Sequence, residues 1–298
     1  MIGVDCIAIL LLAIGSEQPP ATVDAGNEDS VSTDFGDSDP GSLVETDERI
    51  QRVDKPDHFE SYRPNYILFG DNEDQVLFQF SFRFNIWPTD DALQVFLGYT
   101  QRSWWRLYDA ENSSPFTENN YSPELFFRYR FETAVLGEGF DQIQFGYQHE
   151  SNGEDSVRSR SWDRLYIEQR YVKYFGAPSM DVPTLRAYLR LWVIVAEDPF
   201  NRDLDDFAGP GELIVDLSSG RTGAGRFEAE VLARKGGYNF RFDERTLQLG
   251  LRWIPPWSDW VQFTPGLYVQ SFFGTLQSLE RYNIRDNAIR FGIYFAGG

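Results

Sequence analysis

Eleven residues carry the plainest pattern in this sequence of 298: Val76-Leu-Phe-Gln-Phe-Ser-Phe-Arg-Phe-Asn-Ile86. Every second residue from Val76 to Ile86 is apolar, and from Gln79 onward the residues between them are polar. Successive side chains of a β-strand point to opposite faces, whereas a helix repeats about every 3.6 residues. The stretch therefore predicts a long strand with one apolar and one polar face.

The same alternation returns along the rest of the chain. It is clearest in 185–195, 247–253 and 289–295, and we count roughly 11 or 12 such segments between Gln75 and Ala296. Stretches rich in Gly, Pro, Asp and Asn separate them, and no long helical pattern competes with them. This order predicts an all-β, antiparallel fold of about 12 strands.

Strand length and polarity favour a membrane barrel over a soluble sandwich or barrel. Strands of soluble proteins usually have about 5–6 residues, whereas crossing a bilayer obliquely takes about 9–11, and the clearest segments are of the longer kind. The polar faces carry arginines, which suit a wet or ion-paired lumen better than a dry core. These are Arg83, Arg186, Arg190 and Arg252. We interpret the chain as an antiparallel transmembrane β-barrel of an outer membrane, with a large soluble β-protein as the alternative.

Tryptophans near the expected strand ends support the membrane interpretation. They are Trp87, Trp104, Trp105, Trp253, Trp257 and Trp260. Membrane barrels carry girdles of aromatic side chains where the wall meets the two membrane surfaces. The sequence therefore predicts that these six side chains form such a girdle.

The composition excludes several classes of protein. With 46 Asp and Glu against 27 Lys and Arg, the net charge is −19, whereas a nucleic-acid binder needs a basic surface to meet phosphates. A single cysteine excludes a disulfide framework and a multi-thiolate metal site. No apolar run approaches the roughly 20 residues of a membrane-spanning helix. Nucleic acid is therefore not an expected partner.

The first 61 residues differ from the rest. The apolar run Cys6–Ile14 is too short to span a bilayer and has the length of a signal-peptide core, although no Lys or Arg precedes it. The following residues are rich in Ser, Asp, Glu and Gly, which predicts an acidic, disordered extension. The expected organisation is a signal peptide (1–15), this extension (16–61) and a barrel domain (62–298).

Three residues around one expected hairpin have the chemistry of a nucleophilic triad. His149 and Ser151 continue the apolar face of Phe145 and Tyr147, so imidazole and hydroxyl are neighbours on the lipid-facing side. After a loop, Asp163 lies on the same face of the next strand. If the two strands are antiparallel, Asp163 reaches His149 as a cross-strand neighbour. The three then supply a nucleophile, a base and an orienting carboxylate.

The place of this triad suggests its substrate. Ionisable groups on the lipid face of a barrel are costly and indicate function. At the boundary between headgroups and acyl chains, Ser151 would meet the ester bond of a glycerophospholipid without extracting the lipid. His149 would take the serine proton and pass it to the leaving alcohol, while Asp163 stabilises the imidazolium. Membrane phospholipids are therefore the expected substrate.

The chain from about Tyr62 to its end resembles the outer-membrane phospholipase A family of Gram-negative bacteria. The most specific match is the block His149–Tyr166, with its fixed spacing from HxSNG to SRSWxRxY. Shorter matches occur in the right order: Arg63–Leu68, Tyr99–Gln101, Ser113–Phe116 and Asn120–Phe126. The resemblance implies a twelve-stranded barrel that hydrolyses sn-1 and sn-2 acyl esters and lysophospholipids, depends on Ca²⁺ and is activated by forming a homodimer.

The resemblance also gives roles to single residues. It implies that Ser151 is the nucleophile, that His149 is the base and that the backbone N–H of Gly153 helps to bind the oxyanion. For Ca²⁺ it implies three oxygen ligands, completed by waters. These are the hydroxyl of Ser159, the backbone carbonyl of Glu154 and a serine of the opposite subunit that matches Ser113.

One glutamine is unusual on an apolar face. Gln101 follows Leu97 and Tyr99 on the lipid-facing side of its expected strand. A buried amide costs little if it pairs with its twin across a two-fold axis. The resembling family places a glutamine here at its dimer interface, which implies the same role for Gln101.

One position departs from the family. The third triad residue of well-known members is Asn, whereas this chain has Asp163. An anion stabilises a protonated imidazole more than a neutral amide does. Activity should therefore persist, with its acidic limb at a higher pH than in Asp163→Asn.

Two other functions stay open. A catalytically silent, porin-like barrel would conduct solutes and would not respond to Ser151→Ala. A soluble secreted esterase of another β-fold would enter the aqueous phase without detergent. The intact pair of His149 and Ser151 speaks against the silent barrel, and the outward apolar alternation speaks against the soluble enzyme.

Overall fold

The computed structural model describes residues 59–70, 76–87, 92–113, 115–130, 139–179, 181–237, 245–257 and 263–297. All of them belong to the unit Thr46–Gly298. The predicted signal peptide, 1–15, and residues 16–58 of the predicted extension lie outside the described residues. Within the described ranges, no helix is both long enough and apolar enough to cross a membrane.

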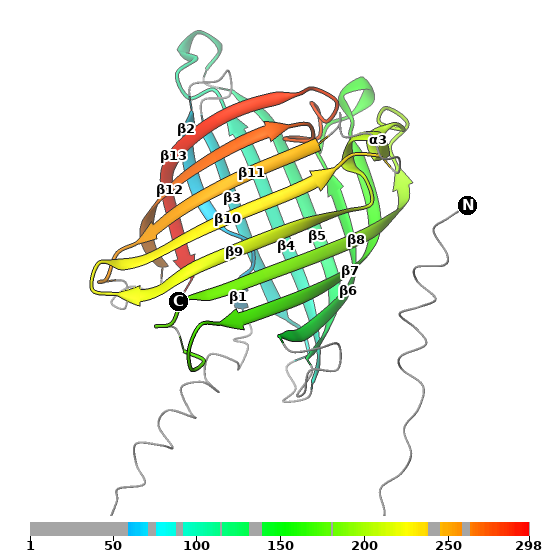
Figure 1. The fold of residues 1–298 in the computed structure, drawn as a ribbon. Coiled ribbons are helices and arrows are strands. Elements are labelled where there is room, and N and C mark those ends of the chain that lie inside the picture. Colours follow the sequence, from blue (N-terminus) through cyan, green and yellow to red (C-terminus); the bar gives the residue numbers. More distant parts are fainter. Residues whose placement is uncertain are drawn as a thin grey trace, which may run out of the picture. The chain divides into compact units, whose positions relative to one another are not determined.

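Antiparallel strands form one sheet that closes on itself (Figure 1). Consecutive strands pair from β3 to β13, and β13 then pairs with β2, which closes the ring through β3. The strands are β1 (Phe59–Ser61), β2 (Asn65–Gly70), β3 (Val76–Asn85), β4 (Leu93–Trp105), β5 (Phe116–Arg130), β6 (Phe140–Ser151), β7 (Ser161–Tyr174), β8 (Thr184–Glu197), β9 (Gly211–Thr222), β10 (Gly225–Lys235), β11 (Arg245–Ile254), β12 (Phe263–Gly274) and β13 (Asp286–Gly297). The described connections contain the short helices η2 (Ala110–Asn112), η3 (Ser156–Arg158) and α3 (Leu204–Ala208).

β1 and β2 are two parts of one barrel strand, so the predicted count of about twelve strands is confirmed. Both pair antiparallel with β3: Phe59 lies opposite Phe84, and Phe69 lies opposite Val76. The break between them contains Pro64, which lacks the N–H that a continuous ladder needs. β1 occupies the last residues of the predicted extension. Within the described residues, the paired sheet begins at Phe59.

The two faces of the strands follow the predicted alternation. In β3, Phe80 and Phe84 are 51% and 42% exposed on the outer wall. Ser81 directly follows Phe80 and Asn85 directly follows Phe84, and both are buried. An apolar outer wall and a polar inner wall are what a lipid environment requires. The sequence pattern therefore gives the correct side of the wall for these four residues of β3, whereas Val76 at the start of the strand has the outward parity but is buried.

The predicted aromatic girdle is correct only in part. Trp87 and Trp257 are exposed just beyond the ends of β3 and β11, as an interfacial position requires. Trp104 is only 2% exposed and packs with Leu68 in an inner apolar cluster, because it has the inward parity of β4. The prediction that Trp104 joins the girdle is wrong. Trp260 lies outside the described residues.

Buried ion pairs fill part of the interior. Arg190 is 2% exposed, and its guanidinium donates to Glu168 at 2.7 Å and lies 3.5 Å from a Glu124 oxygen. Tyr166 donates its hydroxyl to the same oxygen of Glu124 at 2.7 Å. Arg252 makes three ion pairs further round the wall. The predicted ion-paired lumen is confirmed by these contacts.

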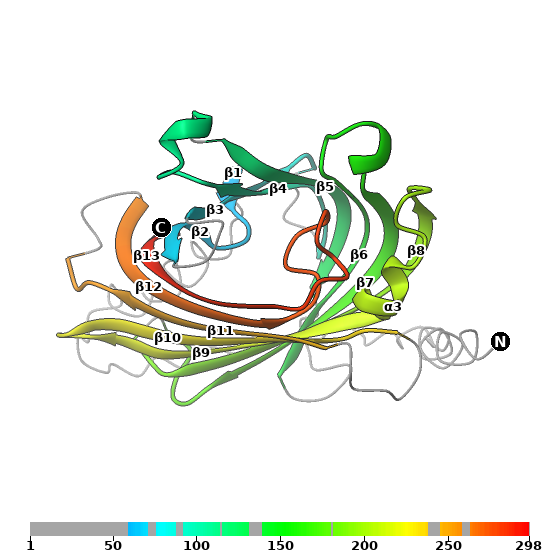
Figure 2. The same cartoon turned by 90° about the horizontal axis from the view of Figure 1, so that it is seen from above.

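The β12–β13 connection, 275–285, folds back across one mouth of the barrel (Figure 2). Leu279 is buried there, and its N–H donates to Asn120 Oδ1 at 3.1 Å. Tyr282 packs in one apolar cluster with α3 and donates its hydroxyl to Asp203. Burial and this carboxylate raise the pKa of Tyr282 to about 12, so the phenol keeps its proton and the contact. A mouth filled in this way disfavours the porin-like alternative.

This mouth is the outward end of the barrel. Membrane barrels have short periplasmic turns and longer extracellular loops. The long connections 198–210 and 275–285 lie at this end, and the two-residue turn between β9 and β10 lies at the other. The β6–β7 connection, 152–160, is also at this end. The residues of the predicted triad therefore lie near the outer-leaflet boundary.

Candidate active site

β6 and β7 bring two of the three predicted triad residues into contact. His149 is the direct cross-strand partner of Asp163, and His149 Nδ1 lies 2.7 Å from Asp163 Oδ1. A carboxylate only accepts, so this contact places the proton on Nδ1 and leaves Nε2 as the acceptor. Ser151 follows His149 on the same outer face, opposite Ser161. The side chains of His149 and Asp163 are 37% and 22% exposed, which leaves them open to a lipid.

A tyrosine that the sequence did not single out completes this contact. Tyr147 Oη donates to Asp163 Oδ1 at 2.8 Å, the oxygen that also meets His149. Two donors on one oxygen fix the rotation of the carboxylate and so the plane of the imidazole. The signal was present in the sequence, because Tyr147 precedes His149 by two residues on the same face.

The loop after Ser151 is held by the side chain of Asn152. Its Oδ1 accepts from the backbone N–H groups of Glu154 at 3.3 Å and Arg160 at 3.0 Å. Gly153 has a φ of +69°, and a Cβ there would lie 2.8 Å from the ring of Tyr121. The position therefore requires glycine, both for its backbone conformation and for space.

Two of the residues expected around Ca²⁺, Glu154 and Ser159, lie on the same loop. Ser159 Oγ donates to Asp198 Oδ2 at 2.8 Å, and Glu154 lies five residues before Ser159. Within the described residues, no group of three or more His, Cys, Asp or Glu side chains could hold a metal ion. Asp198 has no signal in the sequence, because it reaches Ser159 only through the pairing of β7 with β8.

Ser113 and Gln101 lie two strands away from β6. Ser113 is exposed in the β4–β5 connection, directly after η2, with a φ of 64°. Gln101 is on the outer face of β4, where it accepts from Tyr99 Oη at 2.9 Å and donates to Ser103 Oγ at 3.1 Å. Both residues lie outside the β6–β7 hairpin that carries the predicted triad.

Comparison with known proteins decides the family. A model of the phospholipase A1 family matches residues 45–295. The chain belongs to the phospholipase A1 family. Phospholipase A1 of Escherichia coli K12 is 29% identical over 273 residues, which are 85% of this chain and 86% of that protein. Phospholipase A1 of Klebsiella pneumoniae is 28% identical over 264 residues, 82% of this chain and 84% of that protein.

Solved structures share the barrel of this phospholipase A1 family member. An active-site mutant of outer membrane phospholipase A from Escherichia coli has a TM-score of 0.66 at 24% identity, over 82% of this chain and 94% of that chain. The calcium-bound dimer of Salmonella typhi outer membrane phospholipase has a TM-score of 0.63 at 23% identity, over 80% and 91%. The family and the closed barrel confirm the predicted enzyme class, a carboxylic ester hydrolase, and the predicted outer-membrane location.

Proposed function

We propose that this protein hydrolyses the sn-1 and sn-2 acyl esters of glycerophospholipids, and those of lysophospholipids, with Ser151, His149 and Asp163 as its triad. The observation that carries the proposal is the 2.7 Å contact between His149 Nδ1 and Asp163 Oδ1 on the lipid-facing wall. An ion-pairing imidazole at that depth is costly without a function. Fatty-acid release from phospholipid–detergent micelles, compared between wild type and Ser151→Ala, tests the proposal.

The reaction proceeds in two halves. Ser151 Oγ attacks the acyl carbonyl carbon while His149 Nε2 takes the serine proton, and the carbonyl oxygen becomes an oxyanion near the Gly153 N–H. The intermediate breaks its C–O bond to the glycerol oxygen, which receives the proton from His149. Water then attacks the acyl–serine ester while His149 Nε2 takes its proton, the C–Oγ bond breaks, His149 returns the proton to Ser151 Oγ, and the fatty acid leaves. Asp163 stabilises the imidazolium in both halves.

Calcium belongs to the same proposal. Hydroxyl, carboxylate and carbonyl oxygens suit this hard cation, and the Ser159 hydroxyl beside Asp198 supports such a site. We propose Ser159, Asp198 and the backbone carbonyl of Glu154 as ligands from one copy, and Ser113 from a second copy. When bound, the ion would stabilise negative charge that develops on the carbonyl oxygen.

A homodimer completes the proposal. The outer face of β4 supports it, because Gln101 lies there among apolar side chains. The amide of Gln101 donates one hydrogen to Ser103 and accepts from Tyr99 with one lone pair, so a second amide hydrogen and a second lone pair remain for a partner. A twin Gln101 across a two-fold axis would satisfy both. The Salmonella typhi relative is a calcium-bound dimer.

Removal of calcium should lower hydrolysis about a hundredfold or more, because the ion supplies charge stabilisation to the oxyanion. The measurement is fatty-acid release in micelles with calcium, with a chelator, and with the chelator followed by excess calcium. Magnesium, which is smaller and gives up its waters reluctantly, should not restore the rate. Equal rates with and without chelator would exclude the calcium part of the proposal.

Tyr147→Phe should lower kcat about three- to tenfold with little change in KM, because it removes one hydrogen bond from a charged carboxylate. Tyr174→Phe, at the opposite end of β7, is the matched control and should leave kcat and KM unchanged. A Tyr147→Phe enzyme with the wild-type kcat would remove this positioning role.

Asp163→Asn should keep activity at a lower kcat, because an amide oxygen still accepts from His149 Nδ1 but lacks the negative charge that stabilises the imidazolium. Fatty-acid release by wild type and variant in micelles checks this expectation. A rate as low as that of Ser151→Ala would contradict it.

A further inference from the structure

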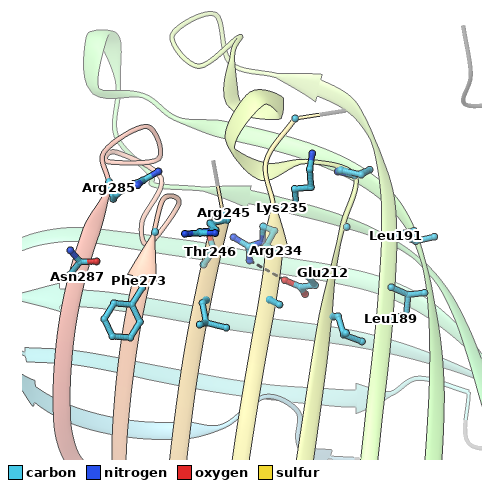
Figure 3. Close-up of a pocket in the computed structure, with 17 residues that line it drawn as sticks. Leu189, Leu191, Glu212, Arg234, Lys235, Arg245, Thr246, Phe273, Arg285 and Asn287 are labelled. Carbon is cyan, nitrogen blue, oxygen red and sulfur yellow. Dashed lines mark hydrogen bonds and ion pairs between the residues drawn. The ribbon is translucent and has the colours of Figure 1, made fainter. Parts of the chain in front are cut away.

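A broad groove lies on the outer wall of β8 to β13, at the outward end of the barrel (Figure 3). It encloses about 950 Å³, and small residues, among them Gly211 and Ala233, form part of its lining. Larger apolar side chains flank them and are exposed to the surroundings of the barrel: Leu189, Leu191, Leu213, Leu247 and Phe273. The groove therefore presents apolar walls to the acyl chains of the outer leaflet.

Cations gather at the outward edge of the groove. Lys235 ends β10, Arg245 begins β11 and Arg285 directly precedes β13, so all three lie above the apolar walls (Figure 3). Glu212 is the one carboxylate among the described lining residues, and it pairs with Arg234 at 3.0 Å. This positive edge stands out in a chain of net charge −19. Apolar walls below a cationic edge match a lipid that carries negative charge on its headgroup.

The width of the groove selects the kind of lipid. Neighbouring strands lie about 4.8 Å apart, so six strands span on the order of 24 Å of wall. The three cations come from three different strand ends within this span. Several acyl chains side by side and more than one phosphate fit such a site better than one two-chain phospholipid does.

We propose that this groove binds a phosphorylated, multi-acyl glycolipid of the lipid A type, with phosphates at Lys235, Arg245 and Arg285 and acyl chains along the apolar walls. The site is separate from the triad on β6 and β7, and from Gln101 on β4. Bound lipid would therefore remain in place while the triad acts and while a second copy docks at β4. It would anchor the barrel among the glycolipids of the outer leaflet.

The test is a lipid titration of the purified full-length protein in detergent, with bound lipid counted by native mass spectrometry. The probes are bis-phosphorylated, hexa-acylated lipid A, phosphatidylglycerol and phosphatidylcholine. Lipid A should bind more tightly than phosphatidylglycerol, and phosphatidylcholine should bind most weakly. The triple variant Lys235→Gln/Arg245→Gln/Arg285→Gln should bind lipid A about a hundredfold more weakly, at the usual contribution of one basic residue near a charged lipid surface.

Two further variants separate this site from general effects of charge and folding. Lys173→Gln/Arg202→Gln/Arg221→Gln removes the same charge outside the groove and should leave lipid A binding unchanged. Ala233→Trp fills the groove without changing charge and should weaken lipid A binding. Micellar phospholipid hydrolysis should stay at the wild-type rate in all three variants, which shows that they fold. Equal lipid A binding by wild type and the groove triple variant, or binding of phosphatidylglycerol as tight as that of lipid A, would overturn the proposal.

Discussion

Replacing Ser151 by alanine is expected to lower phospholipid hydrolysis by about 10⁴-fold or more, because it removes the atom that would form the acyl–enzyme bond in the proposed reaction. His149 and Asp163 would remain in contact at 2.7 Å, so the variant changes the chemistry and not the arrangement of the base. The measurement is fatty-acid release from phospholipid–detergent micelles with calcium present. A residual rate above that in water would reflect the oxyanion site and substrate binding alone.

Ser161→Ala is the matched control for this experiment. Ser161 is the cross-strand partner of Ser151 on β7 and faces the same outer wall. Its loss should change hydrolysis less than about threefold, since no step of the reaction uses its hydroxyl. If Ser151→Ala kept the wild-type rate, the triad would be wrong. If both variants lost activity equally, the loop rather than the nucleophile would be responsible.

The barrel and the contact of His149 with Asp163 were predictable because both depend on local patterns. Alternation in 76–86 fixes which side chains face lipid, and repetition of that alternation implies a closed sheet. The contact of His149 with Asp163 follows from one hairpin, since the short loop 152–160 sets the register of β6 against β7. A sequence reveals such a contact when two strands are neighbours both in the chain and in the sheet.

Other features depend on residues far apart in the chain, and no local sequence pattern predicts them. Asp198 meets Ser159 from 39 residues away, through the neighbouring strand pair. The N–H of Leu279 meets Asn120 across 159 residues, so the filled mouth of the barrel could not be predicted. Trp104 is a tryptophan near a strand end, as expected in a girdle, but its place in the alternation of β4 turns its side chain inward. The partner of each inward charge also depends on which strands become neighbours across the lumen.

Arg190→Met should lower the free energy of unfolding by about 3–5 kcal/mol, the usual cost of removing one partner from a buried ion pair. The guanidinium is buried and contacts Glu168 at 2.7 Å and Glu124 at 3.5 Å, so its loss takes the nearest cation from two buried carboxylates. Glu168 then keeps only the longer contact with Arg63, at 3.8 Å. Urea unfolding in detergent micelles, followed by tryptophan fluorescence, measures the change. Adding Glu168→Gln to the variant should recover part of the loss, because one uncompensated charge disappears.

Arg186→Met provides the comparison that makes this result interpretable. Arg186 lies four residues earlier on the same strand and the same inward face, but its side chain is 37% exposed and lies 3.7 Å from Asp216. A partly solvated pair of this kind contributes less than about 1 kcal/mol. If Arg190→Met lowers the free energy of unfolding much more than Arg186→Met does, the buried ion pairs of Arg190 with Glu168 and Glu124 stabilise the wall behind the proposed triad, and inward charge in general does not. Equal losses of unfolding free energy in the two variants would mean that water reaches Arg190. The packed interior would then no longer argue against a conducting pore.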